Sequence, residues 1–239
     1  MNETKVSDQL KENYDDYYSS GDSEWRRIGA ECKADNIVEL CGSLPKSKVL
    51  EVGAGEGSIL KRLDELSFGE SLYALEISQS GVDAISSKGI RNLADCKLFN
   101  GYQVPYEDKT FDIAIMSHVV EHVEHERALL YEVSRVARYV YVEVPLEDTL
   151  RLSHEFVLDK VGHINFYSPK TLRRLVQSCN LNVINQITRN PSKATHTFYG
   201  GRKGLVQYYI KEGFLRAMPL VAPKFFTYHG ALVCENKEG

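Results

Sequence analysis

The feature that most constrains the fold is the stretch VLEVGAGEGSIL, residues 49–60, in which a short apolar run leads into three glycines and then a helical pattern. The run VLEV is typical of a buried parallel strand. Glycines at every second position allow a tight turn and leave no side chain between the backbone and a bound ligand. The following helix would point its unpaired N–H groups at the same gap. Together these features predict a pocket for a nucleotide-type ligand.

Two familiar glycine signatures do not describe this loop. The dinucleotide pattern G-x-G-x-x-G needs glycine at position 58, where Ser58 stands. The phosphate-binding loop that ends in glycine and lysine is also absent. Glu51 precedes the glycines, and its carboxylate would repel a pyrophosphate but attract the ammonium group of an amino acid. An NAD-dependent oxidoreductase is therefore disfavoured.

The segment Glu51-Val52-Gly53-Ala54-Gly55-Glu56-Gly57 resembles the first motif of the class I S-adenosylmethionine (SAM) methyltransferases, an acid followed by three alternating glycines. The resemblance implies SAM as the cofactor and a Rossmann-like, doubly wound α/β fold with a seven-stranded sheet. Within this segment it assigns the cofactor contacts to Glu51, Gly53, Ala54, Gly55 and Gly57.

Two later segments extend the resemblance toward the adenosine part of SAM. Glu76 ends an apolar strand pattern about 20 residues after the glycine loop, where a carboxylate can accept hydrogen bonds from two ribose hydroxyls. Ile77 would pack against the adenine ring. Asn100 and Gly101 occupy the place where the family usually has an acid and a small residue. The side-chain carbonyl of Asn100 could still accept a hydrogen bond from the adenine amino group.

The strand pattern FDIAIM, residues 111–116, resembles the fourth motif of the small-molecule (type 11) methyltransferases. Ser117 would contact the cofactor, and His118 would lie between cofactor and substrate. Downstream, GHINFYS, residues 162–168, resembles a stretch of the same enzymes. We predict His163 as the general base, because imidazole titrates near neutrality. A hydrogen-bonded loop anchor is the alternative role for His163. The implied reaction is in-line methyl transfer, in which the protein mainly positions the reactants.

The region before the glycine loop predicts two helices, separated by a break at Ser20-Gly21-Asp22. In the resembling family such a segment often covers the cofactor, with Tyr14, Tyr18 and Arg26 as the candidate contacts; packing is their alternative role. We therefore expect a helical lid over residues 1–44 and a methyltransferase domain over 45–239. Substrate-side insertions are expected at about 145–168 and 189–203.

Strand and helix patterns alternate along the rest of the chain, as in a parallel, doubly wound sheet. One continuous helix is expected over residues 119–136. The last strand is expected over 225–234, interrupted at Gly230. The family resemblance implies that this strand lies antiparallel between the fifth and sixth strands.

The segment His118-Val119-Val120-Glu121-His122 also fits the inverted zinc-protease signature H-x-x-E-H. Two histidines four residues apart share a helix face and can bind one zinc ion, with the glutamate as base. Such a site needs a long helix, whereas these residues lie at a strand-to-helix junction. We predict no metal site, and keep a zinc-dependent hydrolase that uses His118, Glu121 and His122 as one alternative. A non-catalytic SAM-binding module is the other.

Composition limits the classes of molecule that the protein is expected to bind. The net charge of −4 over 239 residues argues against a nucleic-acid binder, and five scattered cysteines predict reduced thiols in the cytoplasm. No apolar run reaches the roughly 18 residues of a membrane span, so no membrane association is expected. From Asn185 onward, eight Lys/Arg stand against three Asp/Glu. This excess is typical of a solvated surface, or it helps receive an anionic acceptor. We favour O- or N-methylation of a small molecule such as a sugar, a nucleotide-linked sugar or a phosphorylated metabolite.

Overall fold

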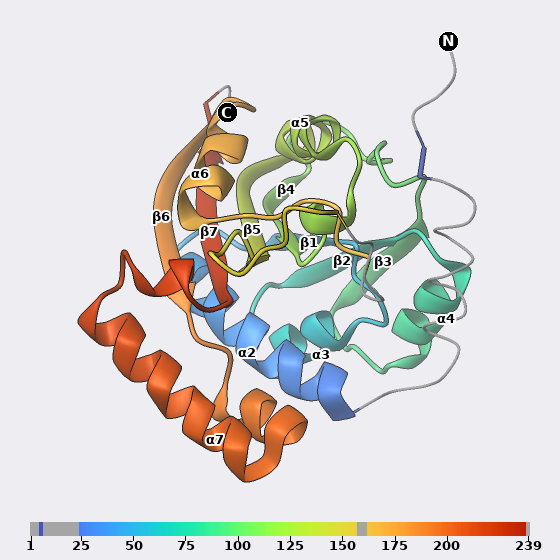
Figure 1. Ribbon diagram of the computed structural model, residues 1–239. Helices are drawn as coiled ribbons and strands as arrows, with labels where there is room; N and C mark the ends of the chain where they lie inside the picture. The colour runs from blue at the N-terminus through green and yellow to red at the C-terminus, as the bar shows by residue number, and fades with distance from the viewer. Residues whose placement is uncertain (1–4, 7–23, 157–161, 238–239) are drawn as a thin grey trace.

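The computed structural model describes residues 5–6, 24–156 and 162–237. Their centre is a seven-stranded sheet in the order β3-β2-β1-β4-β5-β7-β6 (Figure 1). β1 to β5 are parallel, and β7 runs antiparallel between β5 and β6 as predicted. The strands are β1 Lys48–Val52, β2 Ser71–Glu76, β3 Leu93–Leu98, β4 Phe111–Ser117, β5 Ala137–Leu146, β6 Leu181–Arg189 and β7 Tyr228–Asn236. The predicted Rossmann-like α/β fold is confirmed.

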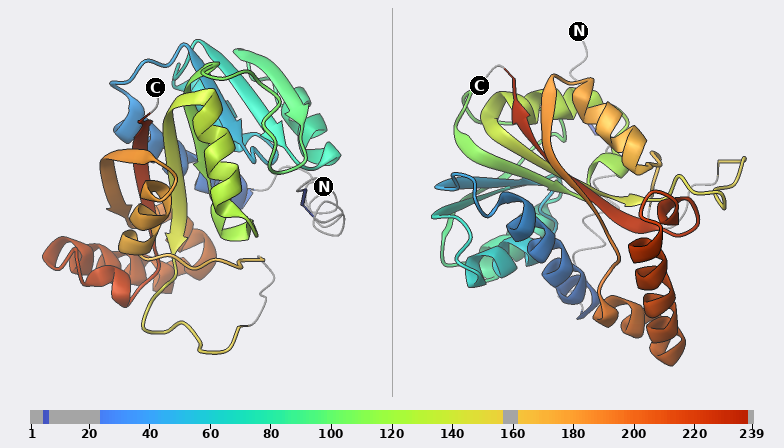
Figure 2. Two further views of the ribbon diagram at one scale, coloured as in Figure 1. Left: turned by 90° about the horizontal axis from the view of Figure 1, so that it is seen from above. Right: turned by 90° about the vertical axis from the view of Figure 1, so that its left-hand side faces the viewer.

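Helices cover both faces of the sheet (Figure 2). One face carries α2 Glu24–Cys41, α3 Ser58–Glu65 and α4 Gln79–Ser87, and the other carries α5 Glu126–Val136 and α6 Pro169–Gln177. The long helix α7 Lys193–Ala217 extends beyond the sheet next to α2. Short 3-10 helices lie at Val120–His122 and Ala222–Lys224. Within the described ranges, no helix has the length and apolar content needed to cross a membrane.

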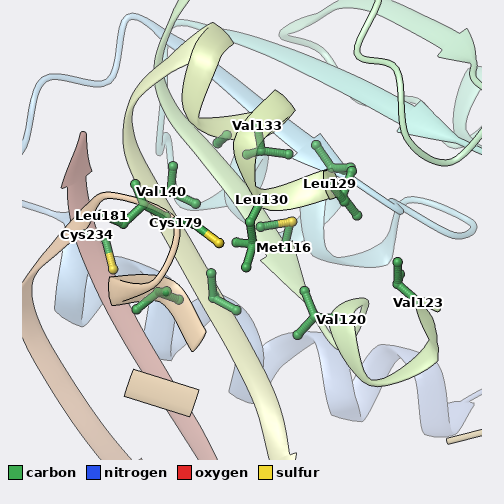
Figure 3. Packing of buried hydrophobic residues seen from close by; sticks show 14 of the residues in the cluster. Met116, Val120, Val123, Leu129, Leu130, Val133, Val140, Cys179, Leu181 and Cys234 are labelled. Carbon is green, nitrogen blue, oxygen red and sulfur yellow. The ribbon is translucent and has the colours of Figure 1, made fainter. Parts of the chain in front are cut away.

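The two apolar layers follow from the alternation of side chains along each strand. In β4, Ala114 and Met116 face the α5 layer, whereas Ile113 and Ile115 face the α2 layer. Figure 3 shows Met116 among side chains of α5 and β5. All four β4 side chains are fully buried, which explains why FDIAIM reads as a continuous apolar run.

The prediction of one continuous helix over residues 119–136 is wrong for the first half of this range. A 3-10 helix at Val120–His122 is followed by extended backbone at Val123, and α5 begins only at Glu126. The cause is a distant segment. The backbone N–H groups of Ile164 and Asn165 donate to the Glu121 carbonyl, and the Asn165 side chain donates to the Val120 and Val123 carbonyls. These carbonyls would otherwise accept from the next helical turn.

Two expectations near the C-terminus also need correction. β7 continues through Gly230, because glycine there makes room for the Leu146 side chain of β5: a Cβ atom would lie 2.5 Å from Leu146 Cδ2. The segment 189–203, expected as a polar insertion, instead supplies the end of β6 and the start of α7. Ser192 caps that helix by accepting a hydrogen bond from the Thr195 N–H, and the helix bends at Gly201, where φ is 53°.

The N-terminal prediction is met in part. The second expected helix forms as α2 and carries Arg26. Tyr14, Tyr18 and the break at Ser20-Gly21-Asp22 lie outside the described residues. The division into a lid and a domain remains a prediction.

Candidate cofactor and acceptor site

The glycine loop joins the end of β1 to the start of α3, and its backbone conformation requires glycine. Gly53, Gly55 and Gly57 have φ of 72°, 58° and 80°, a region that side-chain-bearing residues rarely adopt. A Cβ atom on Gly53 would lie 2.7 Å from Val119 Cγ2, and one on Gly57 would lie 2.9 Å from Ile85 Cγ1. The loop is therefore held close to its neighbours and presents bare backbone.

Glu76, at the end of β2, is fixed against this loop. Its Oε2 accepts a hydrogen bond of 2.8 Å from the Gly55 N–H, and its Oε1 accepts from the backbone N–H and hydroxyl of Ser78, each at 3.1 Å. Burial raises the pKa of Glu76, and these hydrogen bonds oppose that shift. A carboxylate oxygen can accept more than one hydrogen bond, so this group can still bind hydroxyls.

Glu51, in β1, is buried with unfilled hydrogen-bonding capacity. It is 1% exposed, and within the described part of the chain its Oε2 has no hydrogen-bond partner. Burial raises the pKa of Glu51 to about 8, while the charge of Lys33 on α2 opposes the shift. A ligand ammonium group would supply the missing donor, because buried polar groups are normally satisfied.

Two cavities meet over the glycine loop, and both are lined by Gly53 and His118. The cavity of about 80 Å³ lies on the Glu76 side, and its other lining residues are Val6, Ile77, Phe99, Gly101, Val119, His122, Val123 and Leu129. The cavity of about 150 Å³ lies on the Glu51 side, and its other lining residues are Trp25, Arg26, Gly29, Ala30, Lys33, Ala54, Gly55, Glu56, Ser58, Ile59 and Ser117. An elongated ligand with a hydroxyl-rich part and an ammonium-bearing part matches this pair of cavities.

Most of the sequence-predicted cofactor residues border these cavities. They are Glu51, Gly53, Ala54, Gly55, Glu76, Ile77, Gly101, Ser117 and Arg26. Asn100 is engaged differently: its Oδ1 accepts hydrogen bonds from the backbone N–H groups of Tyr102 and Gln103, at 3.0 and 2.8 Å. This carbonyl, expected to face adenine, thus stabilises the following turn, and the neighbouring Gly101 lines the cavity.

Sequence reasoning missed several lining residues. Lys33 lies one and two helical turns after Gly29 and Arg26 on α2, so helical spacing could have identified it as a member of the same face. Val6 could not have been found in this way. Its backbone N–H donates to the Asn100 carbonyl at 3.0 Å, and this contact spans 94 residues without a local signal.

The carboxyl ends of β4 and β5 carry a second polar group, centred on Glu143, which the sequence analysis did not single out. One of its carboxylate oxygens accepts from Asn36 and His229, and the other from Ser117 and Tyr141. Burial alone would raise the pKa of Glu143. The hydrogen bond from His229, the charge of His229 and the charge of His118 instead lower this pKa to about 2. Glu143 is therefore a buried, fully hydrogen-bonded carboxylate.

His118 follows β4 in a strained conformation with φ of 59°. Its backbone N–H donates to the Glu143 carbonyl, and its ring centroid lies 4.7 Å from that of His229. Burial, Lys33 and His229 lower the pKa of His118 well below its usual value. His163 lies in the segment between β5 and α6. Its Nδ1 is 2.7 Å from Glu147 Oε2, and its ring centroid is 4.8 Å from that of His122.

Comparison with known proteins agrees with this geometry. The model of a methyltransferase domain family matches residues 25–186. YrhH of Bacillus subtilis, a protein named as a methyltransferase, is 30% identical over 91 residues, which is 37% of this chain and 51% of YrhH. The chain MJ1123 of Methanocaldococcus jannaschii is 23% identical over 133 residues, 56% of each chain. The aligned regions thus span about half the length of these curated relatives.

Among solved structures, the cyclase SpnF superposes with a TM-score of 0.68 at 16% identity, over 99% of this chain and 98% of SpnF. Geranyl diphosphate C-methyltransferase from Streptomyces coelicolor A3(2), in complex with Mg²⁺, geranyl diphosphate and S-adenosylhomocysteine, gives a TM-score of 0.68 at 11% identity, over 97% and 100% of the two chains. At these identities the superpositions establish the fold alone.

The family match covers more than half of the chain, so this protein belongs to the class I SAM-dependent methyltransferases. Its cofactor is SAM. The residues present fit that cofactor: Glu76 could accept hydrogen bonds from ribose hydroxyls, and the bare glycine loop allows close approach. The open oxygen of Glu51 suits the ammonium of the methionine part.

Proposed function

We propose that this protein transfers the methyl group of SAM to a hydroxyl or amine of a small-molecule acceptor. The observation that carries this proposal is the pair of cavities that meet at Gly53 and His118. In this placement the ribose hydroxyls bind Glu76 and the ammonium group binds Glu51. The methyl group that SAM supplies would then lie between these two ends, next to Gly53 and His118.

The acceptor is proposed to approach from the carboxyl ends of β4 and β5. In open α/β sheets this edge is where ligands bind. His118 occupies the boundary between this edge and both cavities, and an imidazole there can take a proton from a hydroxyl or amine. The buried Glu143 lies next to it and would favour the protonated ring.

A small acceptor, as opposed to a nucleic acid, is supported by the charge of the chain. The net charge is −4, whereas nucleic-acid binding domains are usually strongly basic. The zinc-hydrolase alternative has no comparable support. It requires His118 and His122 on one long helix, and the described segment forms a 3-10 helix of three residues there.

The test uses SAM labelled on its methyl carbon, with separate pools of sugars, nucleotide-linked sugars, phosphorylated metabolites, RNA and protein. We expect label in a small-molecule pool. His118→Asn should reduce the rate by about 10²- to 10⁴-fold, the usual contribution of a general base, without loss of S-adenosylhomocysteine binding. The exposed His125→Asn, outside both expected substrate-side insertions, is the matched control and should retain full activity.

Label confined to RNA or protein would contradict a small acceptor. S-adenosylhomocysteine binding without labelling of any pool would favour the non-catalytic SAM-binding module.

A further inference from the structure

Glu121 is a buried carboxylate with no role in the cofactor site. It belongs to the 3-10 helix and is fully buried, and within the described part of the chain neither side-chain oxygen has a hydrogen-bond partner. His118 Nδ1 lies 3.3 Å from Glu121 Oε1 but is not aligned for a hydrogen bond. A buried charge is costly unless it is paired or coordinates a metal.

Two histidines adjoin this carboxylate, and each uses its Nδ1 elsewhere. His122 Nδ1 is 3.1 Å from the Gly162 carbonyl oxygen, and His163 Nδ1 is 2.7 Å from Glu147 Oε2. When Nδ1–H donates in each ring, Nε2 is the nitrogen atom that can bind a metal ion. Metal-binding histidines commonly donate their other ring N–H to a carbonyl or carboxylate in this way.

The three side chains have the spacing of a metal site. One ligand atom from each of Glu121, His122 and His163 lies within 4.8 Å of the others. The backbone also fixes the two segments that bring them together, because the Ile164 and Asn165 N–H groups donate to the Glu121 carbonyl at 2.8 and 3.0 Å. The arrangement is therefore held by bonds between residues about forty positions apart.

We propose that Glu121, His122 and His163 bind one divalent transition-metal cation. Two imidazoles and one carboxylate suit Zn²⁺ or Fe²⁺, and three protein ligands leave coordination positions open. His122 also lines the smaller cofactor cavity. An open position there would hold an oxygen of the acceptor beside the transferred methyl group; this part rests on the proposed function. The proposal replaces the predicted absence of a metal and assigns His163 as a ligand in place of a general base.

A second group of similar composition, His118, Glu143 and His229, is less suited to a metal. Its potential ligand atoms also lie within 4.8 Å of one another. The four side chains that donate to the two Glu143 oxygens, however, leave this carboxylate little capacity for a cation.

The test is equilibrium dialysis of the metal-stripped protein against Zn²⁺, with no SAM present. We expect one zinc ion per chain. His122→Ala and His163→Ala should each weaken zinc affinity by at least tenfold. His229→Ala, from the second group, and the exposed His154→Ala are the matched controls and should bind zinc as the wild type does.

Glu121→Gln separates loss of the site from loss of the fold. It should weaken zinc binding by at least tenfold, yet leave the metal-free protein at least as stable as the wild type, because an uncharged amide replaces a buried carboxylate. Glu147→Gln, which acts through the His163 ring, should weaken zinc binding by about 10- to 100-fold.

Wild-type protein without stoichiometric zinc, or zinc lost only in His229→Ala, would overturn the proposal. Because the dialysis contains no SAM, such a failure leaves the test of methyl transfer unaffected.

Discussion

Four buried glutamates differ in whether the protein supplies hydrogen-bond donors to both of their carboxylate oxygens. Glu76 and Glu143 have hydrogen-bond donors on both oxygens. Glu51 and Glu121 keep at least one oxygen without a partner within the described part of the chain. Because an unsatisfied buried charge is destabilising, we interpret the second pair as residues whose partners arrive with a ligand.

Buried Lys211 provides a pH-dependent prediction at the residue scale. It is 6% exposed, its Nζ lies 5.1 Å from the centre of the Tyr228 ring, and burial lowers its pKa to about 8 from the usual 10.5. Between these values the unfolded chain binds a proton that the folded chain does not. The contribution of Lys211 to stability therefore rises with pH across this window.

We expect Lys211→Met to stabilise the fold by about 1–3 kcal/mol at pH 7, because it removes a buried charge. This gain should shrink as the pH rises from 8 toward 10.5, because the lysine of the folded wild type loses its charge over this range. Urea unfolding at pH 7 and pH 10 measures the difference in free energy of unfolding between Lys211→Met and the wild type. The exposed Lys224→Met is the control. A gain that is equal at both pH values would contradict the assignment.

At the scale of elements, local pattern predicted most strands but not the interruption after β4. β1, β2 and β4 have apolar runs bounded by turns or charged residues. These patterns predicted the bounds of the three strands to within a few residues. The break between the 3-10 helix and α5 depends on hydrogen bonds from Ile164 and Asn165, which no local pattern contains. Gly230 was expected to interrupt β7. Its packing against Leu146, which explains the glycine within a continuous strand, is also a tertiary contact that no local pattern contains.

The same limit applies to the site. Position relative to the glycine loop predicted that Glu51 and Glu76 lie near one another, and they line the two adjoining cavities because the carboxyl ends of β1 and β2 are adjacent. The Glu143 group stayed unrecognised because its donors come from α2, β4, β5 and β7. The continuous helix expected over residues 119–136 failed around Glu121 and His122, because hydrogen bonds from a distant segment interrupt it there.

Helix α6 offers a prediction about a single element. Ser168 accepts a hydrogen bond from the Thr171 N–H, and Thr171 accepts one in return from the Ser168 N–H, which forms a capping box before Pro169. Ser168→Ala should lower the free energy of unfolding by about 0.5–2 kcal/mol. Ser86→Ala, at an exposed position in the last turn of α4, is the comparison and should be neutral or slightly stabilising. Equal effects in denaturant unfolding would count against the capping role.

For the whole molecule, the fold alone does not specify the reaction. SpnF, which superposes over nearly the full chain, is a cyclase, whereas geranyl diphosphate C-methyltransferase of similar fold is a methyltransferase. Family membership and the cavity pair provide the more specific support for SAM. Under the proposed function, the acceptor would be selected at the edge of the sheet that carries His118, Glu143 and His229.

The central claim is that SAM binds across the two cavities with its ribose at Glu76. Calorimetric titration with S-adenosylhomocysteine tests it most directly, on the wild type, on Glu76→Ala and on the exposed control Glu65→Ala. We expect micromolar binding by the wild type and the control. Glu76→Ala should bind at least tenfold more weakly, a loss of about 1.4 kcal/mol or more. No binding by the folded wild type, or unchanged affinity in folded Glu76→Ala, would contradict this account.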